Sequence, residues 1–161
     1  YFNAGALYKR FTPAGPDHAQ IAACAGMADY VDALYARHFT AEADPAARNR
    51  AVHDLMRAHE IAAVAPLLDY LGERNDLRLL GPRRAEDRAP TVAISLPRAA
   101  APIAAALGHE GIACSGGDFY AVRPLEAMGV DLGHGVLRMS LAHYTSAEDA
   151  ARLIAALDRV L

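Results

Sequence analysis

The sequence predicts an α/β protein of the α+β type, in which helices cover a small, mostly antiparallel sheet. The chain has 161 residues, of which 53% are apolar and 22% charged, which suits one globular domain with a buried core. Helical spacing of apolar residues dominates the first half, whereas short apolar runs between Gly and Pro begin after residue 75. These runs alternate with helices without a strict βαβ rhythm, which favours antiparallel pairing.

The sequence of the N-terminal part predicts an extended arm followed by a helix. Residues 1–16 combine Gly and Pro with aromatic side chains, and we expect them to form an extended arm that packs on another body. One domain is expected over residues 17–161. Its first helix begins at the capping residue Asp17, ends near His38 and has one apolar face.

A second, longer helix is predicted over residues 44–72. Asp44 stands at its cap position and Pro45 at its first helical position, where the missing N–H of proline costs nothing. Pro66 lies inside the pattern, and we expect it to kink or break the helix because its ring collides with the preceding turn.

The rest of the chain is expected to form the sheet and three further helical segments. The predicted strands are 77–81, 91–96, 111–114 and 135–144. The predicted helical segments are 98–108, a single turn at 124–129, and 146–161. Ser146 and Asp149 give the last helix a start that resembles a capping box.

Charge and composition argue against several kinds of partner. Arginine accounts for all basic residues except Lys9, and 19 acidic residues are interspersed among them, so no basic stripe for nucleic acid is expected. No membrane span, signal peptide or transit peptide is recognisable, and we expect a cytoplasmic protein. Cys24 and Cys114 are expected to be free thiols, and the histidine spacing predicts no metal site.

Arg138 is the first candidate functional residue. Alternation along the last strand places Leu137, Met139 and Leu141 on one face and Arg138 on the other, among small and apolar residues. A guanidinium there would lose hydration and would need a carboxylate or phosphate partner. The pattern leaves two interpretations open: a buried ion pair within the chain, or a ligand-binding site.

The segment 115–120 is the second candidate. It consists of Ser115, Gly116, Gly117, Asp118, Phe119 and Tyr120. Adjacent glycines allow backbone amides to approach a ligand, and the neighbouring polar groups would line a site, although a glycine pair is also typical of a plain turn. The sequence contains no G-x-S-x-G nucleophile elbow and suggests no partner for Cys114, so a self-contained hydrolase is not expected.

Four segments, in this order and spacing, resemble the C-terminal part of class V aminotransferases, in particular the cysteine desulfurase-like branch. They are FTPAGPDHAQIAACAGMADYV, RAPTVAISLP, GIACSGGDFYAVRPLEAMGV and GVLRMSLAHYTSAEDAARLIAALDRVL. The resemblance implies the C-terminal domain fold of fold-type-I enzymes that depend on pyridoxal phosphate. It also implies an amino-acid substrate, a homodimer and a large cofactor-binding domain of the same enzyme as partner.

The resemblance also implies roles for individual residues. Arg138 matches the arginine that binds the α-carboxylate of the substrate, and a bidentate pair would fix the substrate against the cofactor ring. Residues 115–120 match the active-site loop beside the substrate side chain. Ala14 and Gly15 match the turn that reaches the cofactor phosphate of the partner subunit, although the family has Gly-Thr there.

Other positions depart from the family pattern. Phe119 stands at the best match to the desulfurases' catalytic cysteine, and Cys114 falls several residues too early, which does not favour persulfide chemistry. Thr145 replaces an asparagine of the family. Lys9 is the only lysine in the sequence, and it lies too close to the FTPAG segment to match the Schiff-base lysine.

We therefore expect a C-terminal domain that does not hold pyridoxal phosphate covalently and is inactive alone. The complete enzyme would be a transferase or lyase, with transamination, β-elimination, epimerisation and desulfuration left open, although Phe119 does not favour the last. The alternative is a non-catalytic binding or dimerisation module with the same fold, in which Arg138 is paired internally.

Overall fold

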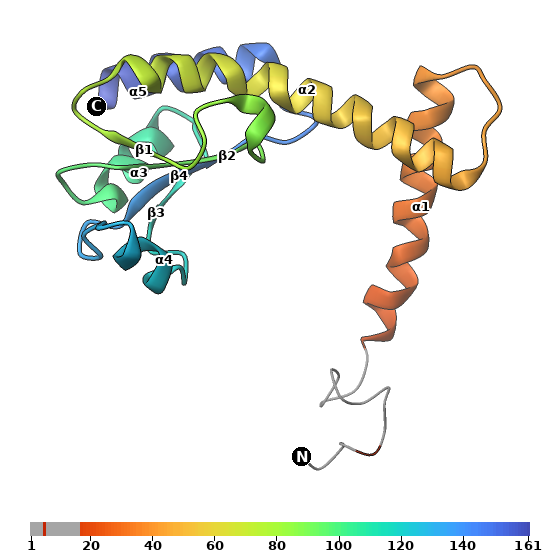
Figure 1. Cartoon of the computed structure of the whole chain (residues 1–161), viewed down its shortest axis with the longest axis horizontal. Coiled ribbons are helices and arrows are strands. Elements are labelled where there is room, and N and C mark those ends of the chain that lie inside the picture. Colours follow the sequence, from red (N-terminus) through yellow and green to blue (C-terminus); the bar gives the residue numbers. More distant parts are fainter. Residues whose placement is uncertain (1–4, 6–16) are drawn as a thin grey trace. The chain divides into compact units, whose positions relative to one another are not determined.

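The computed structural model describes Gly5 and residues 17–161 (Figure 1). The chain divides into two compact units, one ending at Leu55 and one running from Met56 to Leu161, and each is described by itself. Apart from Gly5, the expected arm over residues 1–16 lies outside the described residues. The single domain expected over residues 17–161 stays a prediction.

The first unit contains helix α1 (His18–His38), with the bounds that the sequence predicted. Its cap is formed as expected: the Asp17 carboxylate accepts hydrogen bonds from the backbone N–H groups of Ala19 and Gln20, at 3.0 and 3.1 Å. The apolar face of α1 is exposed at its start, where Ile21 keeps 58% of its surface accessible, and half-buried at Val31, Leu34 and Tyr35.

Helix α2 (Pro45–Glu73) begins at the predicted residue. The Asp44 carboxylate accepts a first-turn N–H at 2.8 Å. The helix continues through Pro66, so it does not break there as one form of the expectation had it, whereas the expected kink stays a prediction. Val64 and Leu67 are fully buried on either side of Pro66, and their burial offsets the roughly 3 kcal/mol that an interior proline costs.

The second unit contains a four-stranded sheet in the order β1-β2-β4-β3, with every pair antiparallel, as the sequence predicted. The strands are β1 (Arg78–Leu80), β2 (Thr91–Ser95), β3 (Ser115–Gly117) and β4 (Val136–Ser140). The helices that follow α2 are α3 (Ala100–His109), α4 (Val122–Ala127) and α5 (Ala147–Val160), with a 3-10 turn at Ala85–Asp87.

The third strand lies later in the chain than predicted. Residues 111–114 were expected to form it, but the structure places β3 at 115–117, where a loop was expected. The reason is how α3 ends: Gly111 adopts φ +77°, and the Ile112 N–H donates to the Leu107 carbonyl at 2.9 Å. This is a Schellman ending, which uses residues 111 and 112 to close the helix rather than to extend the sheet.

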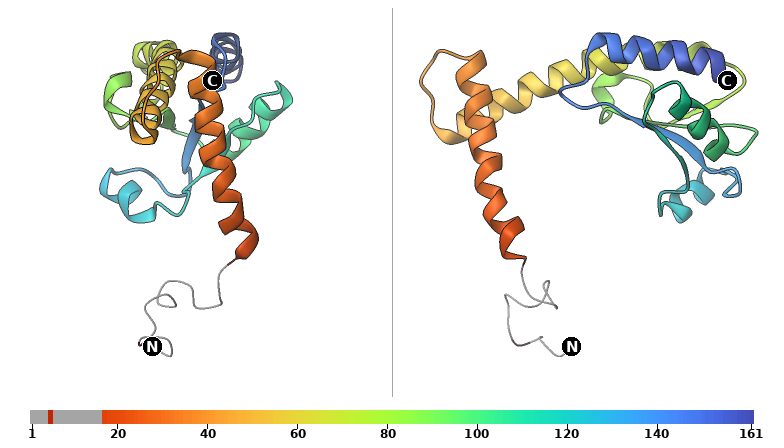
Figure 2. Two further views of the ribbon diagram at one scale, coloured as in Figure 1. Left: turned by 90° about the vertical axis from the view of Figure 1, so that its right-hand side faces the viewer. Right: turned by 180° about the vertical axis from the view of Figure 1, so that it is seen from behind.

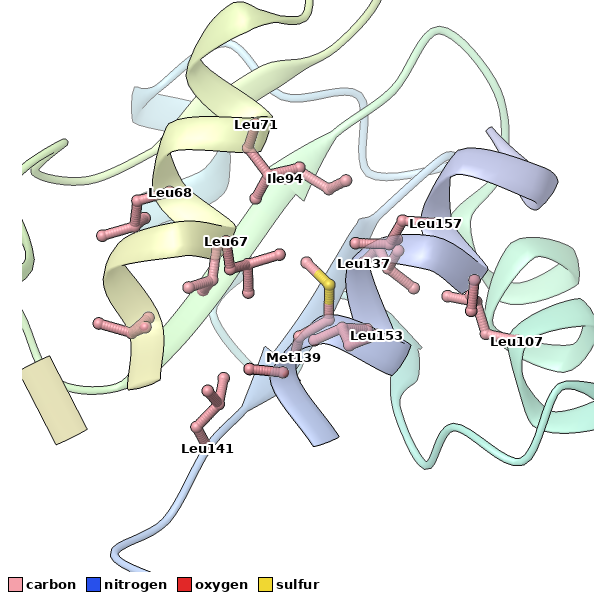
Figure 3. Packing of buried hydrophobic residues seen from close by; sticks show 14 of the residues in the cluster. Leu67, Leu68, Leu71, Ile94, Leu107, Leu137, Met139, Leu141, Leu153 and Leu157 are labelled. Carbon is pink, nitrogen blue, oxygen red and sulfur yellow. The ribbon is translucent and has the colours of Figure 1, made fainter. Parts of the chain in front are cut away.

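The main core of the second unit lies on one face of the sheet. Figures 1 and 2 show α5 and the C-terminal end of α2 on this side of the sheet and α4 on the other side. Figure 3 shows side chains from both helices meeting those of β2 and β4. The residues in contact include Leu67, Leu71, Ile94, Leu137, Met139, Leu153 and Leu157. Each such buried side chain stabilises the fold by about 1.5–3 kcal/mol.

A smaller apolar cluster lies on the opposite face of the sheet. It consists of Leu80, Leu125, Val130 and Val136. On this face, α4 and its flanking loops cover Val136, whereas Arg138 and Ser140, which follow on the same strand, remain exposed. Part of the second face is therefore open, and it carries the candidate site.

Candidate functional site

Arg138 lies in β4, one of the two inner strands of the sheet. Its ladder partners are Ala93 of β2 and Ser115 of β3, both with short side chains, so the long arginine side chain has room above the sheet. Its chain neighbours Leu137 and Met139 point to the opposite face and are buried in the main core. The alternation predicted from the sequence is therefore confirmed.

The expectation that the Arg138 guanidinium is poorly hydrated was wrong, because Arg138 is exposed. Its face of the sheet is only partly covered, and the small neighbours that suggested burial leave the side chain open. Within residues 17–161, no ion pair with an Asp or Glu oxygen within 4.0 Å involves Arg138. The internal ion pair, one of the two interpretations of the sequence, is thus not found in this part of the chain.

The Arg138 guanidinium instead lies over the ring of Phe119. Its Cζ atom is 3.9 Å from the ring centroid, which is the geometry of a cation–π contact. Phe119 is half-buried and packs against the smaller apolar cluster defined above. One face of the guanidinium is therefore covered by a ring that the fold holds in place.

The turn that carries Phe119 has an unusual backbone. Phe119 and Tyr120 have φ values of +54° and +58°, a region that favours glycine, as at the centre of a type I′ turn. Asp118 stabilises the turn, since its carboxylate accepts the Tyr120 N–H at 3.0 Å and its carbonyl accepts the Ala121 N–H at 2.8 Å. Each such backbone conformation costs on the order of 1–3 kcal/mol.

The structure brings together some members of the predicted segment 115–120 and separates others. Ser115 is exposed beside Arg138 on the ladder, and Phe119 contacts the guanidinium. Tyr120 is fully exposed, at 103% of its reference surface. Gly116 is positioned by packing against α3, and Gly117 by the close approach of Gly135.

Sequence reasoning did not single out the hydroxyl groups of Thr91 and Ser140 near Arg138. The Thr91 Oγ1 and Ser140 Oγ atoms lie 3.2 Å apart, at the ladder pair two positions along from that of Arg138 and on the same exposed face. Strand alternation carried the signal, because Thr91 and Ala93 share a face in β2, as Arg138 and Ser140 do in β4.

Cys114 lacks the properties of a catalytic nucleophile. It is half-buried, and burial raises the pKa of its thiol above the ordinary value. A reactive cysteine needs the opposite shift, because the thiolate is the nucleophile. The side chain of Thr145 binds the backbone: its Oγ1 accepts the Ala142 N–H at 2.9 Å.

The described residues form neither a Schiff-base anchor nor a metal site. The described residues include no lysine, so they supply no amine for a Schiff base, and Lys9, Ala14 and Gly15 lie outside them. Over residues 17–161, no three His, Cys, Asp or Glu side chains gather closely enough to hold a metal ion. None of the helices in this same range is long and apolar enough to cross a membrane.

A cavity of about 180 Å³ lies near the C-terminal end of β4. Its polar lining comes from Ser140, Thr145, Asp149 and Arg152. Arg138 does not line it, so this cavity is separate from the Arg138–Phe119 contact.

Comparison with known proteins decides the family. The sequence model described as "Aminotransferase class-V" matches residues 47–153, which is about two thirds of the chain. The chain belongs to the class V aminotransferase family. The matched range includes Arg138, Phe119 and all four strands of the sheet. A search of curated proteins finds no match.

Solved structures support this family fold. The cysteine desulfurase CsdA (S-sulfonic acid) from Escherichia coli is 27% identical, with a TM-score of 0.54, over 70% of this chain and 26% of that chain. An apo cysteine desulfurase from Thermococcus onnurineus NA1 is similar in fold, at 22% identity and a TM-score of 0.60, over 71% of this chain and 29% of that chain. A NifS-like protein from Rickettsia africae ESF-5 shares the fold at 19% identity and a TM-score of 0.57, over 72% of this chain and 31% of that chain. The class V chain described here thus spans less than a third of the length of these structures.

Proposed function

We propose that this chain is the C-terminal domain of a pyridoxal-phosphate-dependent class V enzyme, and that Arg138 binds the α-carboxylate of an amino-acid substrate. The observation that carries the proposal is the state of the guanidinium: it is exposed on the open sheet face, and no described carboxylate lies within 4.0 Å of it. A planar fork of N–H donors in that state is suited to a carboxylate that comes from outside the chain.

None of the residues in the second unit is a lysine, so none can form the Schiff base that anchors pyridoxal phosphate. In this family the cofactor stabilises negative charge at the substrate Cα. We assign no step of that chemistry to this chain. The anchor belongs to a large domain of the same enzyme, and Ala14 and Gly15 would donate backbone N–H groups to the cofactor phosphate in a partner subunit of a cytoplasmic homodimer.

The role of Arg138 is to bind and orient the substrate. Two parallel N–H···O bonds fix the plane of a carboxylate as well as its position, which a single point charge does not do. Orientation matters because a bond aligned for cleavage reacts much faster than a freely rotating one. Residues 115–120 would lie beside the substrate side chain.

The reaction class is proposed to be transamination, β-elimination or epimerisation rather than sulfur transfer. Phe119, which contacts Arg138, stands at the position of the cysteine in the desulfurase pattern. A phenyl ring cannot form a persulfide. The half-buried Cys114, with its raised thiol pKa, does not replace that cysteine.

The proposal is tested with Arg138→Lys in the complete enzyme that contains this chain. We expect kcat/KM for the amino acid to fall about 30- to 1,000-fold, because lysine keeps the charge but loses the bidentate fork. Arg152→Lys, on the exposed face of α5, is the matched control and should leave kcat/KM unchanged. Unchanged kinetics in Arg138→Lys would remove the assignment.

The alternative function is a non-catalytic binding or dimerisation module with the same fold. It is favoured by the contact between Arg138 and Phe119, with Cζ 3.9 Å from the ring centroid, because this contact gives the guanidinium a partner within the chain. In that case Arg138 serves the fold, and Arg138→Lys should lower the free energy of unfolding of the 161-residue chain. The proposed function instead predicts little change in that free energy, because the side chain is exposed.

A further inference from the structure

We propose that Phe119 is a positioning residue for Arg138: its ring supports one face of the guanidinium and leaves the N–H edge directed at an incoming carboxylate. The inference rests on the proposed function of Arg138. It adds a residue that supplies no reacting group and acts through the arginine.

The first argument is the geometry of the contact. With Cζ 3.9 Å from the ring centroid, the guanidinium touches the face of the Phe119 ring. The five N–H donors of an arginine lie in the guanidinium plane, so a ring against the face does not compete with a carboxylate at the edge. The ladder neighbours Ala93 and Ser115 are too short to hold the long side chain in the same way.

The second argument is that the ring itself is held in place. Phe119 is half-buried against the cluster of Leu80, Leu125, Val130 and Val136. Its backbone is fixed in a left-handed conformation by the two hydrogen bonds that Asp118 accepts. Two neighbouring non-glycine residues with positive φ are rare, and such strain persists where the surrounding structure imposes it. A strained turn that delivers a ring to an arginine is therefore consistent with a positioning role.

A pre-positioned guanidinium has a kinetic consequence. An exposed arginine side chain samples many rotamers, and ordering it when the substrate binds costs conformational entropy. The Phe119 ring removes part of that cost before binding. The contact therefore predicts tighter carboxylate binding, seen mainly in KM, with a smaller effect on kcat.

The first test uses NMR of the 161-residue chain, without any cofactor. In the unmodified chain, the Arg138 side-chain resonances should show the ring-current shift of a stacked aromatic. The order parameter of its Nε–H bond should exceed about 0.6, as in restrained groups. Phe119→Leu should abolish the shift and lower the order parameter. Phe119→Tyr, which keeps the ring, should retain both.

Tyr120→Leu is the matched control, because it removes the neighbouring, fully exposed ring of the same turn. It should leave the Arg138 resonances unchanged. A mobile Arg138 side chain without a ring-current shift in the unmodified chain would overturn the proposal, and this outcome does not depend on whether Phe119→Leu folds.

The second test is kinetic and separates this inference from the proposed function. In the complete enzyme, Phe119→Leu should raise KM for the amino acid about two- to sixfold, the range of an exposed cation–π contact, and Phe119→Tyr should restore it. If Arg138→Lys impairs the enzyme but Phe119→Leu does not, the positioning role is wrong and the carboxylate site stands. If Arg138→Lys has no effect, the proposed function itself fails.

Discussion

Gly116 of β3 packs directly against Ala100 at the start of α3. A β-carbon on Gly116 would lie 2.5 Å from the carbonyl carbon of Ala100 and 2.6 Å from its oxygen, closer than atoms approach without bonding. The strand and the helix are therefore in backbone contact, which a side chain at this position would prevent. Packing against Ala100 therefore explains why residue 116 is a glycine, and no bound ligand is needed to explain it.

The first prediction concerns this contact. Gly116→Ala should lower the free energy of unfolding of the second unit by about 1–3 kcal/mol, because β3 and α3 must separate to admit the methyl group. Gly72→Ala is the matched control: it lies in α2, where a β-carbon would meet nothing within 4 Å beyond the adjacent residues and helix backbone, and it should stabilise by up to about 1 kcal/mol. Urea titration of both variants measures the difference. Equal stability of Gly116→Ala and the unmodified chain would contradict the close approach.

The second prediction concerns the turn before α4. Tyr120 is fully exposed with φ +58°, so its backbone is strained while its ring gains little. Tyr120→Asn should stabilise the chain by about 0.5–1 kcal/mol, because asparagine tolerates the left-handed region. Asp118→Ala should have the opposite sign, since it removes the acceptor of the Tyr120 N–H and costs about 0.5–1.5 kcal/mol. Thermal unfolding checks both, and a stabilising Asp118→Ala would show that the turn is not held by this carboxylate.

The elements that the sequence predicted well are those with local chemical signals. Asp17 and Ser146 accept first-turn N–H groups at the expected positions, so the starts of α1 and α5 were predictable from side chains alone. The position of the third strand was predicted wrongly because a Schellman ending at Gly111 and the start of a strand share the same sequence pattern, a glycine followed by apolar residues.

The candidate site was only partly predictable, for a different reason. Strand alternation gave the face of Arg138 correctly, but its exposure depends on how far α4 and its loops cover that face, which periodicity does not determine. The contact with Phe119 depends on a left-handed turn made by two residues that rarely adopt it. The sequence contains no residue pattern that predicts such a turn.

The third prediction concerns acid stability. The Ser146 hydroxyl and backbone N–H donate to the Asp149 carboxylate at 2.7 and 3.0 Å, and these bonds hold the pKa of Asp149 below its ordinary value. A carboxyl with a lowered folded-state pKa stabilises the fold above its unfolded-state pKa, and this stability is lost as the pH falls through the folded-state pKa. The free energy of unfolding should therefore decrease on acidification below about pH 5.

Asp149→Asn is the variant that isolates this contribution. It should be less stable than the unmodified chain near neutral pH and should lose less stability between about pH 5 and pH 3. Some slope should remain, because the pKa values of Asp76 and Glu86 are also lowered, by the Arg74 side chain and by the backbone respectively. Urea titrations across this range measure the slope, and an identical slope in both proteins would contradict the role of the capping box.

The fourth prediction compares the two thiols. Cys24 is exposed on α1, whereas Cys114 is half-buried and burial raises its thiol pKa, so less Cys114 thiolate is present at a given pH. At pH 7.5 iodoacetamide should label Cys24 first, with Cys114 about tenfold slower or more, and the Cys114 rate should keep rising as the pH is raised. In concentrated urea the two rates should converge, which controls for intrinsic reactivity. Peptide mass spectrometry resolves the two sites. Faster labelling of Cys114 in the folded chain would mean that its surroundings activate the thiol, and sulfur chemistry between α3 and β3 would again be a candidate.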